Sequence, residues 1–224
     1  MPTLTQLAAR LSNHLGLDDV TTDAAYSSVY LAEMNRAQDD VGRDIHWPIE
    51  EYTQPNQTTV TFTINANARP DMVLAARVSG AYGDRPVPVV GVEARRQSNI
   101  IGYTNAPPRM VVLAQSGSSA TLEPWPNPTV SLPSTVYYTA IAKATDLVGG
   151  SDVPWGGSGP SWHFLIPLKA SIAMLKRDGR PEEAKENAEE YERQRVQAIL
   201  ELHATRLLTP HIKRLLAPKE MILK

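Results

Sequence analysis

The chain has 224 residues and a mass of 24.6 kDa, the size of one domain or of one domain with a large insertion. Apolar residues make up 42% and charged residues 21%, so a hydrophobic core is expected. The net charge of −2 argues against a basic nucleic-acid-binding protein, and the absence of cysteine excludes disulfides, thiolate zinc sites and cysteine nucleophiles. No secretory signal and no apolar run of about 20 residues is visible, so we expect a soluble protein of a reducing compartment, without membrane contact.

The N-terminal segment predicts a short helix. Leucines recur on one helix face over residues 4–11, and Thr3 with Gln6 fits a capping box. Gly16 suits the left-handed position that follows a helix end.

A second helix is predicted from about Asp23 to Arg43. Thr22 or Asp23 is a suitable N-cap, and apolar residues repeat every three or four positions after it. Gly42 and then Pro48 are expected to end this helix.

The middle of the chain predicts short strands. The expected strands cover residues 58–64, 72–78, 87–94, 109–114, 120–123 and 136–142, with a hairpin loop at 115–119. Thirteen of the 18 prolines lie between Pro48 and Pro160, which favours a sheet with many interruptions. Only 13 of the 109 residues in 52–160 are charged. This low charge fits either a small sandwich or a surface that packs against copies of itself.

The helical period returns after the glycine-rich residues 149–159. Leu165, Leu168, Ile172 and Leu175 form one stripe, and Pro160 or Pro167 is expected near the start of that helix. A junction follows, in which Gly179 suits the end of this helix and Pro181 the first position of the next. The last long helix is expected from Pro181 to about Leu207.

These elements predict an α+β fold: a four-helix bundle with a small, sandwich-like β insertion between helices 2 and 3, plus a C-terminal tail. The expected parts are an N-terminal helical pair (1–50), a β insertion (51–158), a second helical pair (159–208) and a basic amphipathic tail (209–224).

Few residue patterns point to catalysis or to a bound metal. Gly156–Gly159 lacks the lysine of a phosphate-binding loop, so we interpret it as a connector. Asp39, Asp40, Asp44 and His46 contain carboxylates and an imidazole that suit a cation, but acidic residues on a helix more often mark a solvated face. The histidines show no zinc-site spacing and no nucleophile elbow is present. We therefore expect no enzyme, cofactor or metal.

The four tryptophans lie at element junctions near prolines. Trp47, Trp125, Trp155 and Trp162 either close the edges of a core or anchor an interface, and we favour the core. A small ligand-binding protein or enzyme that uses a Trp-rich β segment remains an alternative, and it requires a concave pocket.

The tail combines charge with apolar residues. Residues 202–224 carry five basic side chains and one acidic side chain, whereas the first 50 residues carry eight acidic and three basic ones. Leucine, isoleucine and methionine are interleaved with the basic residues, which is unusual for a solvated tail. We expect the tail to dock on a partner.

Three segments, in order along the chain, form a recognisable pattern. They are Leu4–Leu17 with Tyr30–Gln38, then Leu122–Pro126 with Val136–Tyr138, and finally Ala170–Leu200. The first contains a helix ending in Leu-Gly and an Asn-x-Ala-Gln run, the second a strand, a proline pair and an aromatic strand, and the third a Gly-x-Pro-Glu-Glu junction between helices. This pattern resembles the head–tail connector adaptors of tailed bacteriophages over most of residues 1–205.

The resemblance implies a structural virion protein of the neck, made in the host cytoplasm. Such adaptors form a ring, usually a dodecamer, below the portal and extend the channel through which double-stranded DNA leaves, without sequence preference. The β part would face tail or nozzle proteins, and the C-terminal segment would reach the portal. The residues expected at the portal contact are Arg206, Ile212, Lys213, Arg214, Leu215, Lys219, Ile222 and Lys224. A tail-completion or stopper protein of the virion is the alternative.

Overall fold

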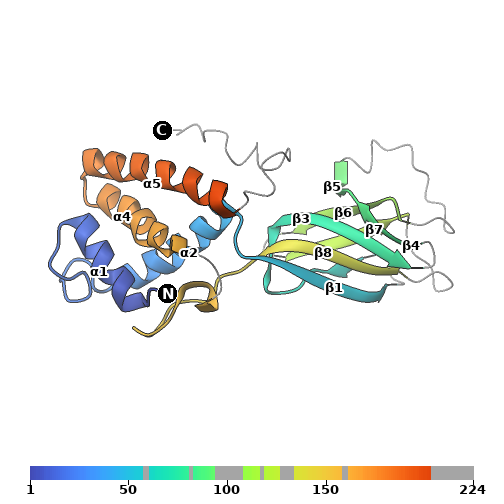
Figure 1. Cartoon of the computed structure of the whole chain (residues 1–224), viewed down its shortest axis with the longest axis horizontal. Helices are drawn as coiled ribbons and strands as arrows, with labels where there is room; N and C mark the ends of the chain where they lie inside the picture. The colour runs from blue at the N-terminus through green and yellow to red at the C-terminus, as the bar shows by residue number, and fades with distance from the viewer. Residues whose placement is uncertain are drawn as a thin grey trace. The chain divides into compact units, whose positions relative to one another are not determined.

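The computed structural model describes residues 1–57, 61–80, 83–93, 108–116, 119–126, 134–157 and 161–202. The chain divides into two compact units (Figure 1). Residues 1–48 and the chain from residue 144 onward form the first, which we call the helical unit. Residues 49–143 form the second, which we call the β unit.

The helical unit is built from both ends of the chain. Its elements are α1 (Leu4–Leu15), α2 (Tyr30–Ile45), the 3-10 turns η1 (Pro154–Gly157) and η2 (Ser161–Phe164), α4 (Leu165–Arg177) and α5 (Pro181–Leu202). Backbone hydrogen bonds join the two ends, because the amides of Leu4 and Thr5 donate to the carbonyls of Asp152 and Gly150. In the same way, Arg180 donates to the Leu15 carbonyl oxygen at 2.9 Å.

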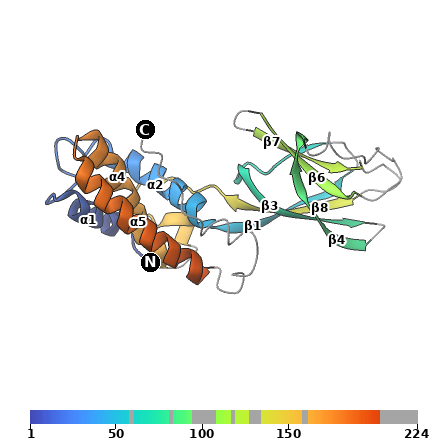
Figure 2. The ribbon, with the colours of Figure 1, turned by 90° about the horizontal axis from the view of Figure 1, so that it is seen from above.

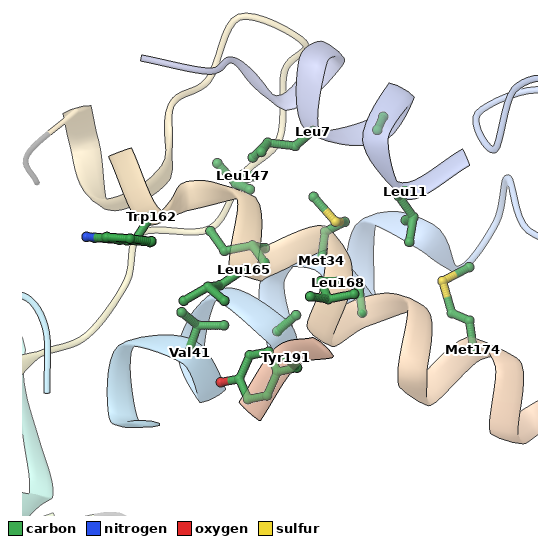
Figure 3. Packing of buried hydrophobic residues seen from close by; sticks show 14 of the residues in the cluster. Leu7, Leu11, Met34, Val41, Leu147, Trp162, Leu165, Leu168, Met174 and Tyr191 are labelled. Carbon is green, nitrogen blue, oxygen red and sulfur yellow. The ribbon is translucent and has the colours of Figure 1, made fainter. Parts of the chain in front are cut away.

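The helices are not arranged as the predicted four-helix bundle, and that prediction is wrong. Helices α1, α2 and α5 each pack on α4, which lies at the centre of the unit. The physical reason is in the sequence of α4, whose buried residues surround most of the helix and do not form one stripe. They are Leu165, Ile166, Pro167, Leu168, Ala170, Ser171, Met174 and Leu175. Figure 3 shows Leu165 and Leu168 among Met34, Val41 and Tyr191 of the neighbouring helices.

The local signals at the helix ends are confirmed. The Thr3 amide donates to the Gln6 side-chain oxygen at 3.1 Å, which completes the capping box. Gly16 and Gly179 both have φ of 70°, the left-handed conformation that glycine adopts without steric cost. Pro181 is the first residue of α5.

The predicted ends of the second helix are wrong. Residues 23–29 form turns, and Asp23 accepts a hydrogen bond from the Ala25 amide at 2.8 Å, so α2 begins only at Tyr30. Gly42 does not end α2. The helix continues to Ile45, and His46 follows in the left-handed conformation with φ of 56°.

The β unit consists of two four-stranded sheets. Their strands are β1 (Ile49–Gln57), β2 (Phe62–Thr63), β3 (Ala68–Gly80), β4 (Gly83–Val87), β5 (Val89–Gly91), β6 (Met110–Ser116), β7 (Ser119–Trp125) and β8 (Ser134–Ala142). One sheet has the order β1-β8-β3-β4 and the other β2-β7-β6-β5. All pairs are antiparallel except β5 with β6. The first and last strands pair, with Ile49 opposite Ile141, so the inserted segment begins and ends at adjacent points.

The two sheets share one core, and Figure 2 shows β6 and β7 on one side of the sandwich and β3 and β8 on the other. Val111 and Leu122 from one sheet and Val136, Tyr138 and Ala140 from the other belong to this core. Because the unit has a core of its own and two four-stranded sheets, the prediction of a small insertion is also wrong.

Several strands differ from the prediction. Strand β1 is missing from it, the strand expected at 58–64 is only Phe62–Thr63 among the described residues, and 87–94 is divided between β4 and β5. The hairpin between β6 and β7 is confirmed by the pairing of Ser116 with Ser119. Residues 144–157, grouped with the β insertion from the sequence, lie in the helical unit, where Leu147 forms two hydrogen bonds with the Asn35 side chain.

Candidate functional site

A groove of about 370 Å³ lies over α4 between α2 and α5. Each of the three helices contributes residues spaced three or four apart, so that one face of each helix lines the groove. The lining residues are Glu33, Arg36, Ala37 and Asp40 of α2, Lys169, Ala170, Ile172, Ala173 and Lys176 of α4, and Ala188, Tyr191 and Glu192 of α5.

Small side chains make the groove. Four of its lining residues are alanines, and Ala173 and Ala188 remain partly exposed together with Ile172. Longer side chains at these positions would fill the space between the helices. The result is an apolar floor between charged residues, which suits the apolar side chains of a bound polypeptide segment.

A polar cluster closes the base of the groove. The carboxylate of Asp44, whose side chain is only 8% exposed, accepts hydrogen bonds from the Tyr191 hydroxyl at 2.8 Å and from Lys169 Nζ at 3.1 Å. Lys169 Nζ also lies 4.5 Å from the centre of the Tyr191 ring. Three helices are therefore joined by one buried carboxylate.

The cluster is a structural element in its ground state. Burial of the Tyr191 hydroxyl, together with the negative charge of Asp44, raises the pKa of Tyr191 well above its ordinary value. Tyr191 is therefore a hydrogen-bond donor here and not a base. The Lys169 ammonium is neutralised by Asp44, so these groups stabilise the unit and shape the groove.

The predicted metal candidates do not converge. Asp40 lines the groove, Asp44 lies at its base with Lys169 and Tyr191, and His46 follows the end of α2. Within the part of the chain that the structure describes, no group of three or more histidine, aspartate or glutamate residues is placed to hold a metal ion.

The tryptophans mostly belong to the helical unit. Trp155 and Trp162 are buried in its core and Trp47 packs against it, which confirms the core interpretation for these three. Only Trp125 lies in the β unit, so the β segment is not Trp-rich once folded. The alternative of a ligand site built from clustered tryptophans in the β unit is therefore wrong.

His163 is an unusual member of the same core. Its side chain is fully buried and its ring lies 5.2 Å from the Trp155 ring, and neither ring nitrogen has a hydrogen-bond partner among the described residues. Burial lowers the pKa of His163, so the imidazole is neutral at pH 7. The sequence gave no signal for this position beyond its place between two aromatic residues.

Charge is distributed unevenly between the parts of the chain. The described residues of the helical unit contain 17 acidic and 10 basic side chains, a net charge of −7. Helix α5 alone has seven acidic and three basic residues. Residues 203–224 carry five basic side chains and one acidic side chain, a net charge of +4. The helical unit and the tail are thus oppositely charged.

The predicted portal-contact residues, Arg206 to Lys224, lie outside the described residues. Comparison of the sequence with protein-family models and with curated proteins finds no match. Among the described helices, none combines the length and apolar character needed to cross a membrane.

Proposed function

We propose that this protein is a head–tail connector adaptor of a tailed bacteriophage, a structural subunit of the virion neck. In this proposal, copies of the chain form a ring, most simply a dodecamer, below the portal protein. The ring joins the capsid to tail or nozzle proteins and extends the channel for double-stranded DNA. The proposal rests first on the pattern that resembles such adaptors.

The opposite charges of the helical unit and the tail are the observation that carries the proposal. A ring requires heterologous contacts, in which one surface of a subunit meets a different surface of the next. A unit with a net charge of −7 and a tail with a net charge of +4 provide two complementary surfaces in one chain. The two-unit organisation adds a second argument, because separately folded helical and β units allow one chain to contact two different partners.

The charge of the helical unit also fits a channel for DNA. A net negative surface repels phosphates and has no tendency to bind DNA tightly. DNA that passes such a surface is held neither by charge nor by base contacts, which agrees with a conduit and not with a sequence-specific binding protein.

We expect the basic tail to contribute to portal binding. The double substitution Lys213→Glu with Arg214→Glu changes the tail charge from +4 to 0 and keeps the apolar residues. We expect it to weaken binding to the portal encoded in the same genome by about tenfold at low salt, and less at high salt where charges are screened. Titration of labelled portal with the full-length chain measures this change.

The matched control reverses two basic residues in a described helix. Lys185 and Arg193 of α5 are exposed, so Lys185→Glu with Arg193→Glu makes the same change in net charge away from the tail. We expect this control to bind the portal with at most a twofold change. Equal losses in both double variants would mean that total charge, and not the tail, determines the affinity.

A further inference from the structure

The groove over α4 is an unfilled apolar surface on a strongly acidic unit. Its floor contains the partly exposed Ile172, Ala173 and Ala188, and its rim contains charges of both signs. Glu33 and Asp40 of α2 are without an ion-pair partner among the described residues, whereas Lys169 is neutralised by Asp44. A segment that combines apolar and basic side chains matches both the floor and the acidic residues.

The same chain contains such a segment. Residues 203–224 carry a net charge of +4 and three apolar groups, at Leu207–Leu208, Leu215–Leu216 and Met221–Leu223. We infer that, in the free protein, residues 203–224 dock into the groove between α2 and α5 of their own chain.

The length of the tail allows this contact. Helix α5 ends at Leu202, and Ala188 in the groove lies 14 residues earlier, which corresponds to about 21 Å along the helix axis. A segment of 22 residues spans up to about 70 Å when extended, so it can turn back and cover the groove. Because the tail is covalently attached, its effective concentration at the groove is of millimolar order, which favours binding in the same chain over binding to a second copy in dilute solution.

Docking would also control when the tail meets a partner. The apolar residues that fill the groove include Leu215 and Ile222, which we expect at the portal contact. A tail held in the groove is shielded from solvent until a partner with higher affinity displaces it. This consequence rests on the proposed function, whereas the contact between tail and groove does not.

The absence of native cysteine makes a crosslinking test clean. In the full-length chain, Ala173→Cys in the groove is combined with Ala217→Cys in the tail, and the yield of intramolecular disulfide is measured under mild oxidation. The matched control combines Ala9→Cys on the exposed face of α1 with Ala217→Cys. We expect at least a fivefold higher yield for the groove pair, and a loss of that difference when Lys213→Glu and Arg214→Glu are added.

Three results would overturn the inference. Equal yields in the groove and control pairs would show that the tail does not prefer the groove. Disulfide-linked dimers in place of monomers would place the tail of a second copy there. If Ala173→Cys alters the circular dichroism spectrum, Ala188→Cys on the α5 side of the groove replaces it, and an equal yield there has the same meaning. A positive crosslink together with a chain that does not bind the portal would contradict only the adaptor function.

Discussion

Replacing Asp44 with alanine is expected to destabilise the helical unit by about 3 kcal/mol. The substitution removes the acceptor of two hydrogen bonds, from Tyr191 and Lys169, and leaves a buried hydroxyl and an ammonium group without their carboxylate. Urea unfolding followed by circular dichroism at 222 nm, which reports mainly on the helices, measures the change in the free energy of unfolding.

Two further variants separate the contributions to this loss. Tyr191→Phe removes only the hydroxyl and is expected to cost about 1 kcal/mol, and the double variant should cost less than the sum of the two single losses. Asp40→Ala is the matched control, because Asp40 lies on the same helix one turn away and is only half-buried. We expect its effect to stay within about 0.5 kcal/mol. A loss below about 1 kcal/mol for Asp44→Ala would contradict the structural role of the cluster.

Replacing Gly42 with alanine is expected to destabilise the helical unit by about 2 kcal/mol. A Cβ atom at position 42 would lie 2.6 Å from the carbonyl oxygen of Trp47 and 3.4 Å from Nε1 of Trp155. The Trp47 amide donates to the Gly42 carbonyl oxygen at 2.8 Å, so the backbone cannot move away without loss of this hydrogen bond. Alanine favours a helix over glycine by about 1 kcal/mol, but the backbone clash outweighs that gain.

Gly149→Ala serves as the control for this substitution. It lies in the same unit, its φ is not positive, and an added Cβ would meet the Asp152 carboxylate at an ordinary 3.6 Å. The same urea unfolding measurement should therefore show a change within about 0.5 kcal/mol. If Gly42→Ala proved as stable as the natural sequence, the close approach of the chain after α2 would be wrong.

The features that could be predicted from the sequence are those that neighbouring residues determine. The capping box at Thr3 and Gln6, the left-handed glycines at 16 and 179 and the start of α5 at Pro181 all depend on contacts within a few residues. Such local signals act regardless of the surrounding fold, and they were confirmed.

The features that were missed depend on distant residues. Strand β1 contains two glutamates and a proline and shows no apolar alternation, and it is a strand because β8 pairs with it. Gly42 was taken for a helix end, although its role is to admit Trp47 against the helix. Asp44 was considered a cation ligand or a solvated residue, and its partners Lys169 and Tyr191 lie more than 120 residues away.

The groove was also beyond the reach of the sequence. Its alanines belong to three helices, and each alone is typical of a helix with small side chains on one face. Only the central position of α4, with α2 and α5 on either side, brings them together. The acidic character of residues 1–50 and the basic character of the tail, by contrast, are visible directly in the sequence.

The adaptor proposal is tested most directly by multi-angle light scattering after size exclusion. The full-length chain is measured alone and mixed with the portal protein encoded in the same genome. The proposal predicts a stable complex with about one adaptor chain for each portal subunit, as closed ring symmetry requires. If the chain elutes apart from the portal, with its mass unchanged by mixing, the assignment as a portal-bound adaptor is contradicted.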